Sequence, residues 1–133
     1  MGVTVSIRDQ AGAGATAEQA LELDVPAAVT LRDLIRTRVR EEVAKANAAI
    51  GEGRAFRTLV QPSEAEATLN GYRMRKGRTI DWQRQADEAE KAFARNGFFV
   101  LVDGRQLEDL DEGLALTADS EIRFVRLTPL VGG

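Results

Sequence analysis

The sequence predicts an α+β fold in a single domain that spans residues 1–133. Three observations indicate this class. Apolar and polar residues alternate near both ends of the chain, two segments between them have helical periodicity, and Gly, Pro and Asn-Gly signals separate the segments. The length of 133 residues fits one domain, and a hydrophobic share of 44% is enough to build an apolar core.

A pair of strands is predicted in the first 26 residues. Apolar side chains alternate with polar ones in both: Val3, Val5 and Ile7 in the first, and Leu21, Leu23 and Val25 in the second. This period of two is typical of strands that bury one face. The Gly- and Ala-rich stretch 11–17 is predicted to be a loop, and Pro26 to end the second strand, so the two strands suggest a hairpin.

The first helix is predicted to begin at Thr30, which suits a helix N-cap, with Asp33 in the first turn. Apolar residues then recur at steps of three and four: Leu31, Leu34, Ile35, Val39, Val43 and Ala46. This spacing is typical of an amphipathic helix. We expect the charged residues of the segment to cover its solvent-exposed face: Arg32, Arg36, Arg38, Arg40, Glu41 and Glu42.

The segment 48–78 has the weakest pattern in the chain. Its GEGR sequence at 51–54 predicts a break, and residues 55–60 suit a short strand. Ser63 and Glu66 have the spacing of a capping box, and Asn70-Gly71 resembles a helix stop. We therefore expect a short helix between them.

A second long helix is predicted from Thr79. Its apolar stripe steps by four, three and four residues: Trp82, Ala86, Ala89 and Phe93. Asn96-Gly97 is a signal for the C-terminal end of this helix. We interpret Trp82 as a packing residue rather than a platform for a ligand.

The last third of the chain returns to strand patterns. An uninterrupted apolar run at 98–102 is followed by Asp103-Gly104, a strong hairpin turn signal, and by a short strand at 106–107. Residues 109–116 suit a turn-rich connection. Alternation returns at 121–127, which predicts the final strand.

Composition excludes several classes of function. The chain has no Cys and no His, so it lacks a thiolate nucleophile, the commonest general base and the commonest zinc ligand. No catalytic constellation stands out at a telling spacing, so we predict neither catalytic nor metal-binding residues and expect a protein that is not an enzyme.

Composition also indicates which partners and which compartment to expect. The formal net charge of −3 makes a nucleic-acid partner unexpected, because such partners require a basic footprint. A local basic cluster at Arg73, Arg75, Lys76 and Arg78 is expected in a solvated loop. No run of 18 apolar residues and no signal peptide occur, so we expect a cytoplasmic protein without a membrane partner.

Three segments of the chain resemble the ubiquitin-like β-grasp family. Ubiquitin's third strand, turn and fourth strand are similar to residues 100–109 (VLVDGRQLED), and its final strand is similar to residues 120–125. Its diglycine end resembles Leu130-Val131-Gly132-Gly133, as do the tails of the prokaryotic sulfur carriers, namely the molybdopterin-synthase small subunit and the thiamine-pathway carrier. The predicted order of hairpin, helix, hairpin, connection and final strand is also that of this family.

The resemblance implies a mixed sheet packed on a helix and covers residues 3–45 and 97–133. Residues 46–96 have no counterpart in ubiquitin or in the small sulfur carriers. We therefore expect a largely helical insertion between the first helix and the third strand.

The resemblance also implies a chemical role for the C-terminal carboxylate, on Gly133. In this family an E1-like adenylating enzyme activates that carboxylate with ATP and magnesium, which the enzyme supplies, so no cofactor of this chain is expected. Gly132 and Gly133 lack a Cβ and can pass a narrow channel. The residues that would thread into the activating enzyme with them are Thr128, Pro129, Leu130 and Val131.

Three functions remain open at this point. The first is a modifier that is joined to amines of target proteins, the second is a sulfur carrier that forms a C-terminal thiocarboxylate for a sulfur-acceptor enzyme, and the third is a binding module that is not conjugated. The large insertion favours a dedicated recognition role over a minimal carrier, and the tail sequence favours the carrier. Of the three functions we expect the modifier.

A candidate docking surface for the activating enzyme follows from the strand patterns. The run 98–102 is apolar on both sides, so two of its side chains are expected to face outward. The candidate surface consists of these residues and of neighbours on the final strand: Phe99, Leu101, Val125, Arg123 and Arg126. The alternative is that the second long helix covers Phe99 and Leu101.

Overall fold

The computed structural model describes residues 2–11, 18–69, 71–75 and 77–126, and residues 1, 12–17, 70, 76 and 127–133 lie outside the described part. The chain forms two compact units. The first consists of Met1–Leu34 and Ala92–Gly133, and the second of Ile35–Lys91. The second unit therefore contains most of the predicted insertion and most of the first long helix.

The described residues contain strands at both ends and two long helices, and the predicted α+β class is confirmed. The helices are α1 (Leu31–Gly51) and α2 (Trp82–Ala94). The strands are β1 (Gly2–Ala11), β2 (Glu18–Pro26), β3 (Ala28–Thr30), β4 (Glu66–Thr68), β5 (Gly71–Arg73), β6 (Phe98–Val102), β7 (Arg105–Leu107), β8 (Gly113–Ala115) and β9 (Glu121–Arg126).

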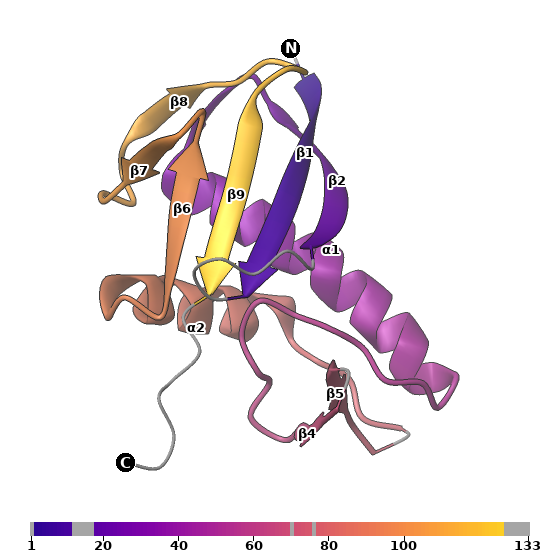
Figure 1. Cartoon of the computed structure of the whole chain (residues 1–133). Coiled ribbons are helices and arrows are strands. Elements are labelled where there is room, and N and C mark those ends of the chain that lie inside the picture. The colour runs from indigo at the N-terminus through magenta and orange to yellow at the C-terminus, as the bar shows by residue number, and fades with distance from the viewer. Residues whose placement is uncertain (1, 12–17, 70, 76, 127–133) are drawn as a thin grey trace. The chain divides into compact units, whose positions relative to one another are not determined.

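A mixed five-stranded sheet forms the centre of the first unit, in the order β2-β1-β9-β6-β7 (Figure 1). The first and last strands of the chain lie side by side, because β9 pairs in parallel with β1. On its other edge β9 pairs antiparallel with β6. The final strand is thus held by hydrogen bonds on both edges, and the sequence of the C-terminal tail begins at its end.

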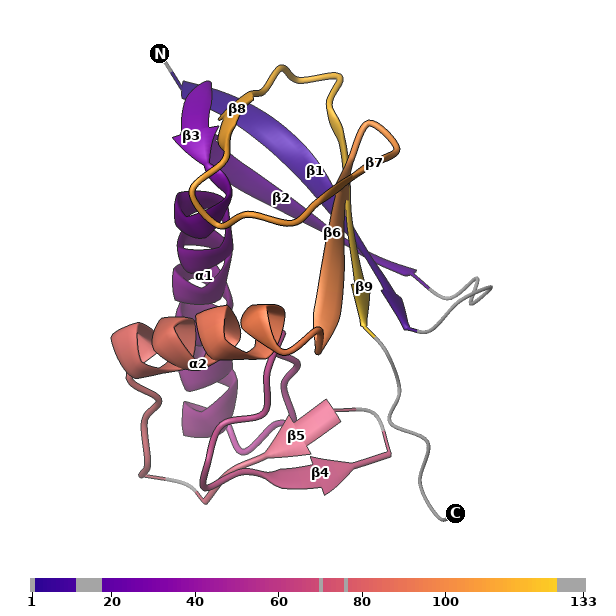
Figure 2. The same cartoon turned by 90° about the vertical axis from the view of Figure 1, so that its left-hand side faces the viewer.

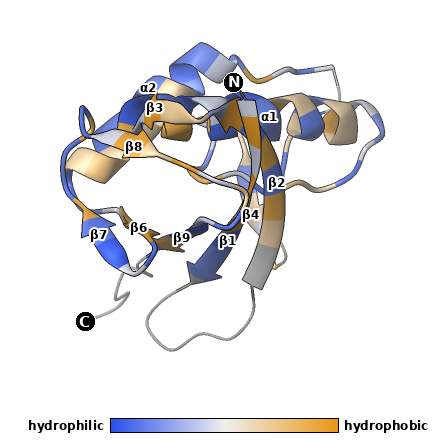
Figure 3. Ribbon diagram, turned by 90° about the horizontal axis from the view of Figure 1, so that it is seen from above, coloured by the Kyte–Doolittle hydropathy of each residue, from blue (hydrophilic) through white to orange (hydrophobic). Residues whose placement is uncertain are grey.

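One face of this sheet is buried and the other is largely polar, as the period-two patterns predict. The buried side chains alternate along four neighbouring strands: Val5, Ile7, Leu23, Val25, Phe98, Val100, Ile122 and Phe124. The rings of Phe98 and Phe124 stack with centroids 5.8 Å apart. Figure 3 shows the hydrophobic colouring of β6 beside the hydrophilic β7. Because a slip of one residue would expose every apolar side chain, this pattern fixes the register.

The predicted hairpin turn is confirmed at Asp103-Gly104. Both residues have positive φ, 51° and 81°, which is the backbone that a two-residue type I′ turn requires. The Asp103 carboxylate also accepts a hydrogen bond from the Glu121 amide at 2.9 Å. The turn is therefore fastened to the start of β9.

The predicted connection 109–116 contains one more strand. Residues 113–115 form β8, which pairs antiparallel with β3, the short strand before α1 (Figure 2). The carbonyls of Leu110 and Glu112 accept hydrogen bonds from the first amides of α1, at 2.8 and 3.0 Å. Thr30 Oγ1 accepts a further one from the Asp33 amide at 3.1 Å, so the predicted N-cap is confirmed.

In the second unit, α1 carries a buried charge that its sequence pattern did not predict. Arg38 was expected on the solvent-exposed face, but only 1% of its surface is exposed. Its guanidinium donates to Glu42 Oε2 at 3.1 Å, and Glu42 Oε1 accepts a hydrogen bond from the Leu59 amide, also at 3.1 Å. The ion pair with the half-buried Glu42, one helix turn away, allows Arg38 to be buried, and Glu42 also fastens the chain near Leu59 to α1.

The predicted break after the first helix is confirmed at its C-terminal end. The helix extends to Gly51, and Gly53 has a positive φ of 72°. The amides of Gly53 and Arg54 donate to the carbonyls of Ile50 and Ala49, at 3.0 and 2.8 Å. Glycine at this position allows the left-handed backbone that ends the helix.

The short helix predicted from Ser63 towards Asn70-Gly71 is wrong. That segment contains the hairpin β4–β5 (Figure 2), and residues 55–60 contribute one bridge, Phe56 with Tyr72, rather than a strand. Gly71 makes this pairing possible, because its φ is 147° and a Cβ there would lie 2.4 Å from the Phe56 carbonyl oxygen. Asn70 lies outside the described residues.

The second helix begins at Trp82, three residues after the predicted start. Asp81 is the N-cap, since its Oδ1 accepts a hydrogen bond from the Gln83 amide at 3.0 Å. Ahead of it, the Asn47 side chain holds Ile80 at two points: its amide group donates to the Ile80 carbonyl at 3.1 Å and accepts from the Ile80 amide at 2.7 Å. These bonds keep residues 79–81 in a non-helical conformation.

The end of α2 matches the prediction. Asn96 has a φ of 62°, and the Gly97 amide donates to the Ala92 carbonyl at 2.7 Å, which is a helix stop of the left-handed type. Along the predicted apolar stripe, Ala86 and Ala89 are fully buried, Phe93 is 8% exposed and Trp82 is half-buried.

Candidate docking surface on the sheet

Four of the five residues predicted to form the docking surface lie together on the polar face of the sheet. Phe99 pairs with Val125 across β6 and β9, and Leu101 pairs with Arg123. All four side chains are half-buried. They therefore form an apolar strip with a guanidinium at one end, and we call these four residues the β6–β9 surface.

The fifth residue, Arg126, lies on the opposite face. It pairs with Phe98, whose side chain is buried, and neighbouring residues of a strand point to opposite sides. The sequence pattern placed Val125 between two arginines, but only Arg123 shares its face.

Sequence reasoning missed Arg8 as the second basic residue of this face. Arg8 lies directly opposite Arg123 in the parallel pair of β1 and β9. Arg123 also donates a hydrogen bond to Gln10 Oε1, at 3.4 Å. Arg8 can be identified only when the parallel register of β1 and β9 is known. These strands come from opposite ends of the chain, so no local sequence pattern contains this information.

Two hollows adjoin the β6–β9 surface. One of about 150 Å³ contains both arginines: Ser6, Arg8, Ser120, Glu121, Ile122 and Arg123 line it. The other, of about 180 Å³, has aromatic rings and a polar rim: Phe93, Ala94, Asn96, Phe98, Phe99, Gln106, Leu107 and Glu108 line it. The arrangement suits a partner protein that offers an apolar side chain beside an acidic one, because guanidinium groups pair well with carboxylates.

The predicted activation site itself lies outside the described residues. This applies to Gly132 and Gly133 and to the four residues expected to thread into an enzyme: Thr128, Pro129, Leu130 and Val131. The structure describes the chain up to Arg126, where β9 ends.

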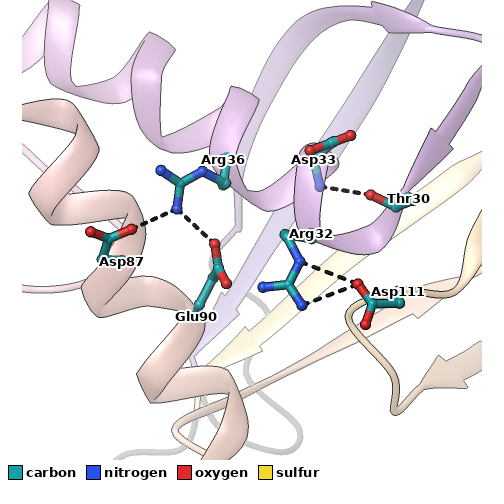
Figure 4. Close-up of polar contacts among 7 residues, drawn as sticks. All are labelled: Thr30, Arg32, Asp33, Arg36, Asp87, Glu90 and Asp111. Atoms are coloured by element: carbon teal, nitrogen blue, oxygen red, sulfur yellow. Dashed lines mark hydrogen bonds and ion pairs between the residues drawn. The ribbon is translucent and has the colours of Figure 1, made fainter.

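Polar contacts stabilise the N-terminal half of α1 within each unit (Figure 4). In the first unit Arg32 forms an ion pair with Asp111 at 3.1 Å. In the second unit the Arg36 guanidinium binds Asp87 at 2.8 Å and Glu90 at 2.6 Å. The hydrogen bond to Asp87, and then that to Glu90, raises the pKa of Arg36 above its ordinary value, so the Arg36 guanidinium stays charged.

The described residues contain neither a metal-binding cluster nor a membrane-spanning helix. No group of three or more His, Cys, Asp or Glu side chains in that part of the chain could hold a metal ion. Neither of the helices seen there is long and apolar enough to cross a membrane.

Comparison with known proteins gives no further assignment. No protein-family model matches the sequence, and neither a curated protein nor a solved structure matches the chain.

Proposed function

We propose that this chain is a ubiquitin-like protein of the β-grasp fold whose Gly133 carboxylate is adenylated by an E1-like enzyme and then joined to amines of target proteins. One observation carries the proposal. The strand β9, fixed between β1 and β6, leads directly into the sequence LTPLVGG at 127–133. A diglycine sequence thus follows a rigid strand at a distance of a few residues.

The order of elements supports the β-grasp part of the proposal. In the first unit a hairpin, β1–β2, precedes the start of α1, a second hairpin, β6–β7, follows, and the last strand inserts beside the first. This is the order of hairpin, helix, hairpin, connection and final strand on which the resemblance to ubiquitin rests.

The proposed reaction uses the chain as a substrate. A Gly133 carboxylate oxygen attacks the α-phosphorus of ATP, pyrophosphate leaves, and a mixed anhydride with AMP forms. A thiolate of the enzyme then displaces AMP to give a thioester, and a target amine displaces the thiolate to give an amide. The lack of a Cβ at Gly132 and Gly133 suits attack at the acyl carbon, because little bulk surrounds it.

The tail is long enough for Gly133 to reach the ATP site of an enzyme while the sheet stays outside. The six residues 128–133 can span roughly 20 Å when extended, at about 3.3 Å per residue. That reach leaves the sheet outside the ATP site, where the β6–β9 surface and Arg8 can contact the enzyme. In this proposal the enzyme supplies ATP, magnesium and all catalytic residues.

A sulfur carrier is the second candidate, because Leu130-Val131-Gly132-Gly133 also resembles the tails of the prokaryotic sulfur carriers. Activation would be the same, but a sulfur donor would displace AMP and leave a thiocarboxylate on Gly133. A binding module with an inert tail is the third candidate.

Mass spectrometry of the tagged chain recovered from its native cells tests all three. An amide bond from Gly133 to a lysine of another protein supports the modifier, and a mass gain of one oxygen-to-sulfur exchange at Gly133 supports the carrier. The intact mass also measures whether Gly133 carries a free carboxylate, which both reactions require.

The control is a chain that lacks Gly132 and Gly133. We expect it to fold normally and to lose both products, together with ATP–pyrophosphate exchange by the activating enzyme. If the truncated chain is activated as well as the full chain, both the modifier and the carrier are excluded.

A further inference from the structure

The β4–β5 hairpin of the second unit carries a leucine that the fold does not use. Leu69 is 98% exposed, and it is the only large apolar side chain in the described part of the chain that is exposed to this degree. Thr68 pairs with Gly71, so Leu69 lies in the short turn between the strands, where Gly, Asn and Asp are the favoured residues. Neither turn chemistry nor burial therefore explains a leucine at this position.

Positive charge gathers in the same part of the sequence. Residues 54–78 contain six of the 18 Lys and Arg residues but only two of the 21 Asp and Glu residues, which gives this segment a formal charge of +4 in a chain whose total is −3. Arg73 belongs to β5, Arg75 and Arg78 follow it, and all three side chains are exposed. The predicted basic cluster is thus solvent-exposed at these three residues, although Arg73 lies in a strand, and Lys76 lies outside the described residues.

Two arginines lie near each other on one face of this hairpin. Arg73 and Gly71 are two positions apart on β5 and so share a face, whereas Tyr72 points to the other side. A Cβ on Gly71 would lie 3.2 Å from the Arg57 Cγ. The Arg57 side chain therefore passes over Gly71, next to Arg73.

The charges of the cluster are only partly balanced by neighbouring acids. Glu66 lies opposite Arg73 across the hairpin, and the Arg78 guanidinium approaches Glu64 at 3.8 Å. No ion pair between described residues includes Arg73 or Arg75. Exposed pairs such as Arg78 with Glu64 contribute little, so an anionic partner can replace them.

An exposed leucine beside exposed guanidiniums fits the surface of an anionic lipid bilayer. The apolar side chain can enter the boundary between headgroups and acyl chains, and the guanidiniums can pair with lipid phosphates. Arginine suits this position, because its long stem can lie along apolar material while the charged group stays in the polar layer. Such a contact requires no helix that spans the membrane.

A nucleic acid is the other polyanion to compare, and it fits this region less well. Single strands bind where bases stack on aromatic rings, and Leu69 has no ring. A hollow of about 460 Å³ in the same unit is lined by three acids, Glu64, Asp81 and Glu88, and by one arginine, Arg84. These carboxylates would repel a phosphate backbone that extended beyond the hairpin.

We propose that the β4–β5 hairpin is a contact site for anionic membranes, in which Leu69 enters the bilayer interface and Arg57, Arg73 and Arg75 bind lipid phosphates. The contact is weak and reversible, because one apolar side chain and a few arginines supply less binding energy than a lipid anchor with two signals. The site uses no residue of the tail, so it is independent of the chemistry proposed for Gly133.

Flotation of the full-length chain with lipid vesicles tests this proposal. We expect binding to vesicles of phosphatidylcholine mixed with phosphatidylglycerol, and little binding to phosphatidylcholine alone or when salt screens the charges. Leu69→Ser should weaken binding to the anionic vesicles about tenfold, and Arg73→Gln and Arg75→Gln about fivefold each. Leu69→Phe keeps an apolar tip and should bind at least as well as the unsubstituted chain.

Two controls separate this site from other causes of binding. Arg95→Gln changes an exposed arginine of the first unit and should have no effect. Removing Gly132 and Gly133 should also leave vesicle binding unchanged. Insertion itself is measured with Leu69→Trp, whose fluorescence should shift to shorter wavelength on addition of anionic vesicles, by more than that of the unsubstituted chain.

Three results would overturn the proposal. They are the absence of binding to anionic vesicles at low salt, unchanged binding by Leu69→Ser, and equal losses for Arg95→Gln and Arg73→Gln. Binding to a DNA or RNA duplex that is lost in Arg73→Gln but unchanged in Leu69→Ser would assign the hairpin to a nucleic acid instead.

Discussion

Leu101 and Arg123 lie directly opposite each other across β6 and β9, on the face of the sheet that the neighbouring Val100 and Phe124 do not share. A half-buried leucine thus has a guanidinium as its cross-strand neighbour. Opposite charges at such positions attract, so a carboxylate at position 101 would be attracted to the Arg123 guanidinium. We therefore expect an acidic residue to be tolerated at position 101 but not on the buried face.

We expect Leu101→Asp to keep the fold and to lose partner binding. The lost apolar burial is partly offset by the new pairing with Arg123, so the free energy of unfolding should fall by less than about 1.5 kcal/mol. If the β6–β9 surface contacts the activating enzyme, adenylation should fall at least about tenfold, as for a central interface residue. Thermal melts and ATP–pyrophosphate exchange measure the two effects.

Val100→Asp is the control for this variant. Val100 is fully buried, and a carboxylate there should unfold the chain. A Leu101→Asp chain that is stable and fully active would exclude a docking role for the β6–β9 surface. A chain that unfolds would show that other residues cover this position.

The outward position of Phe99 and Leu101 could be predicted because strands have a strict period of two. A run of five apolar residues must place some of them on the polar face, whatever the strand pairs with. Arg126 was misplaced for a related reason: the prediction used nearness to Val125 in the sequence, but adjacent residues in a strand face opposite ways. Arg8 required the parallel register of β1 and β9, which only the whole fold determines.

Other elements could not be predicted because their stabilising contacts are not local. Strands β3, β4, β5 and β8 have three residues each, too few to show an alternation. The capping-box pattern at Ser63 predicted a helix, but the segment forms a hairpin instead. Backbone pairing between Phe56 and Tyr72, which lie 16 positions apart, stabilises that hairpin. Arg38 was predicted to be solvent-exposed because a hydropathy pattern scores each residue by itself. The charge of Arg38 makes it polar in such a pattern, and its ion pair with Glu42, which allows its burial, does not enter the pattern.

The burial of Arg38 predicts a large difference between two neighbouring glutamates. Glu42→Ala removes the ion partner of Arg38 and the acceptor of the Leu59 amide, so it should destabilise the fold by about 2–4 kcal/mol. Glu41→Ala changes an exposed side chain and should stay within about 0.5 kcal/mol of the unsubstituted chain. Urea denaturation followed by circular dichroism compares the two. Equal midpoints would mean that the buried pair contributes nothing.

Trp82 should stabilise the fold mainly through cation–π contacts of its ring, because its side chain is not deeply buried. The side chain is half-buried, and the guanidiniums of Arg36 and Arg40 lie 6.0 and 5.4 Å from its ring centroid. Trp82→Ala should therefore cost about 2 kcal/mol, less than the loss of a fully buried aromatic residue. Trp82→Phe keeps an aromatic face and should cost less than about 1 kcal/mol. Equal losses for the two variants, measured by denaturant melts, would show that the cation–π contacts are unimportant.

Two glycines with positive φ should respond differently to alanine. At Gly53, with φ of 72°, a Cβ has nothing within 4 Å, so Gly53→Ala bears only the left-handed backbone cost of about 1 kcal/mol.

At Gly71 the φ of 147° lies in a region that alanine rarely adopts, and a Cβ would meet the Phe56 carbonyl oxygen at 2.4 Å. That oxygen accepts the Tyr72 amide at 2.7 Å, so Gly71→Ala must break this bridge and should cost about 3 kcal/mol or more. Hydrogen exchange separates the two variants: the Tyr72 amide should exchange much faster in Gly71→Ala and at an unchanged rate in Gly53→Ala. An unchanged rate in both would mean that the β4–β5 hairpin does not depend on glycine at position 71.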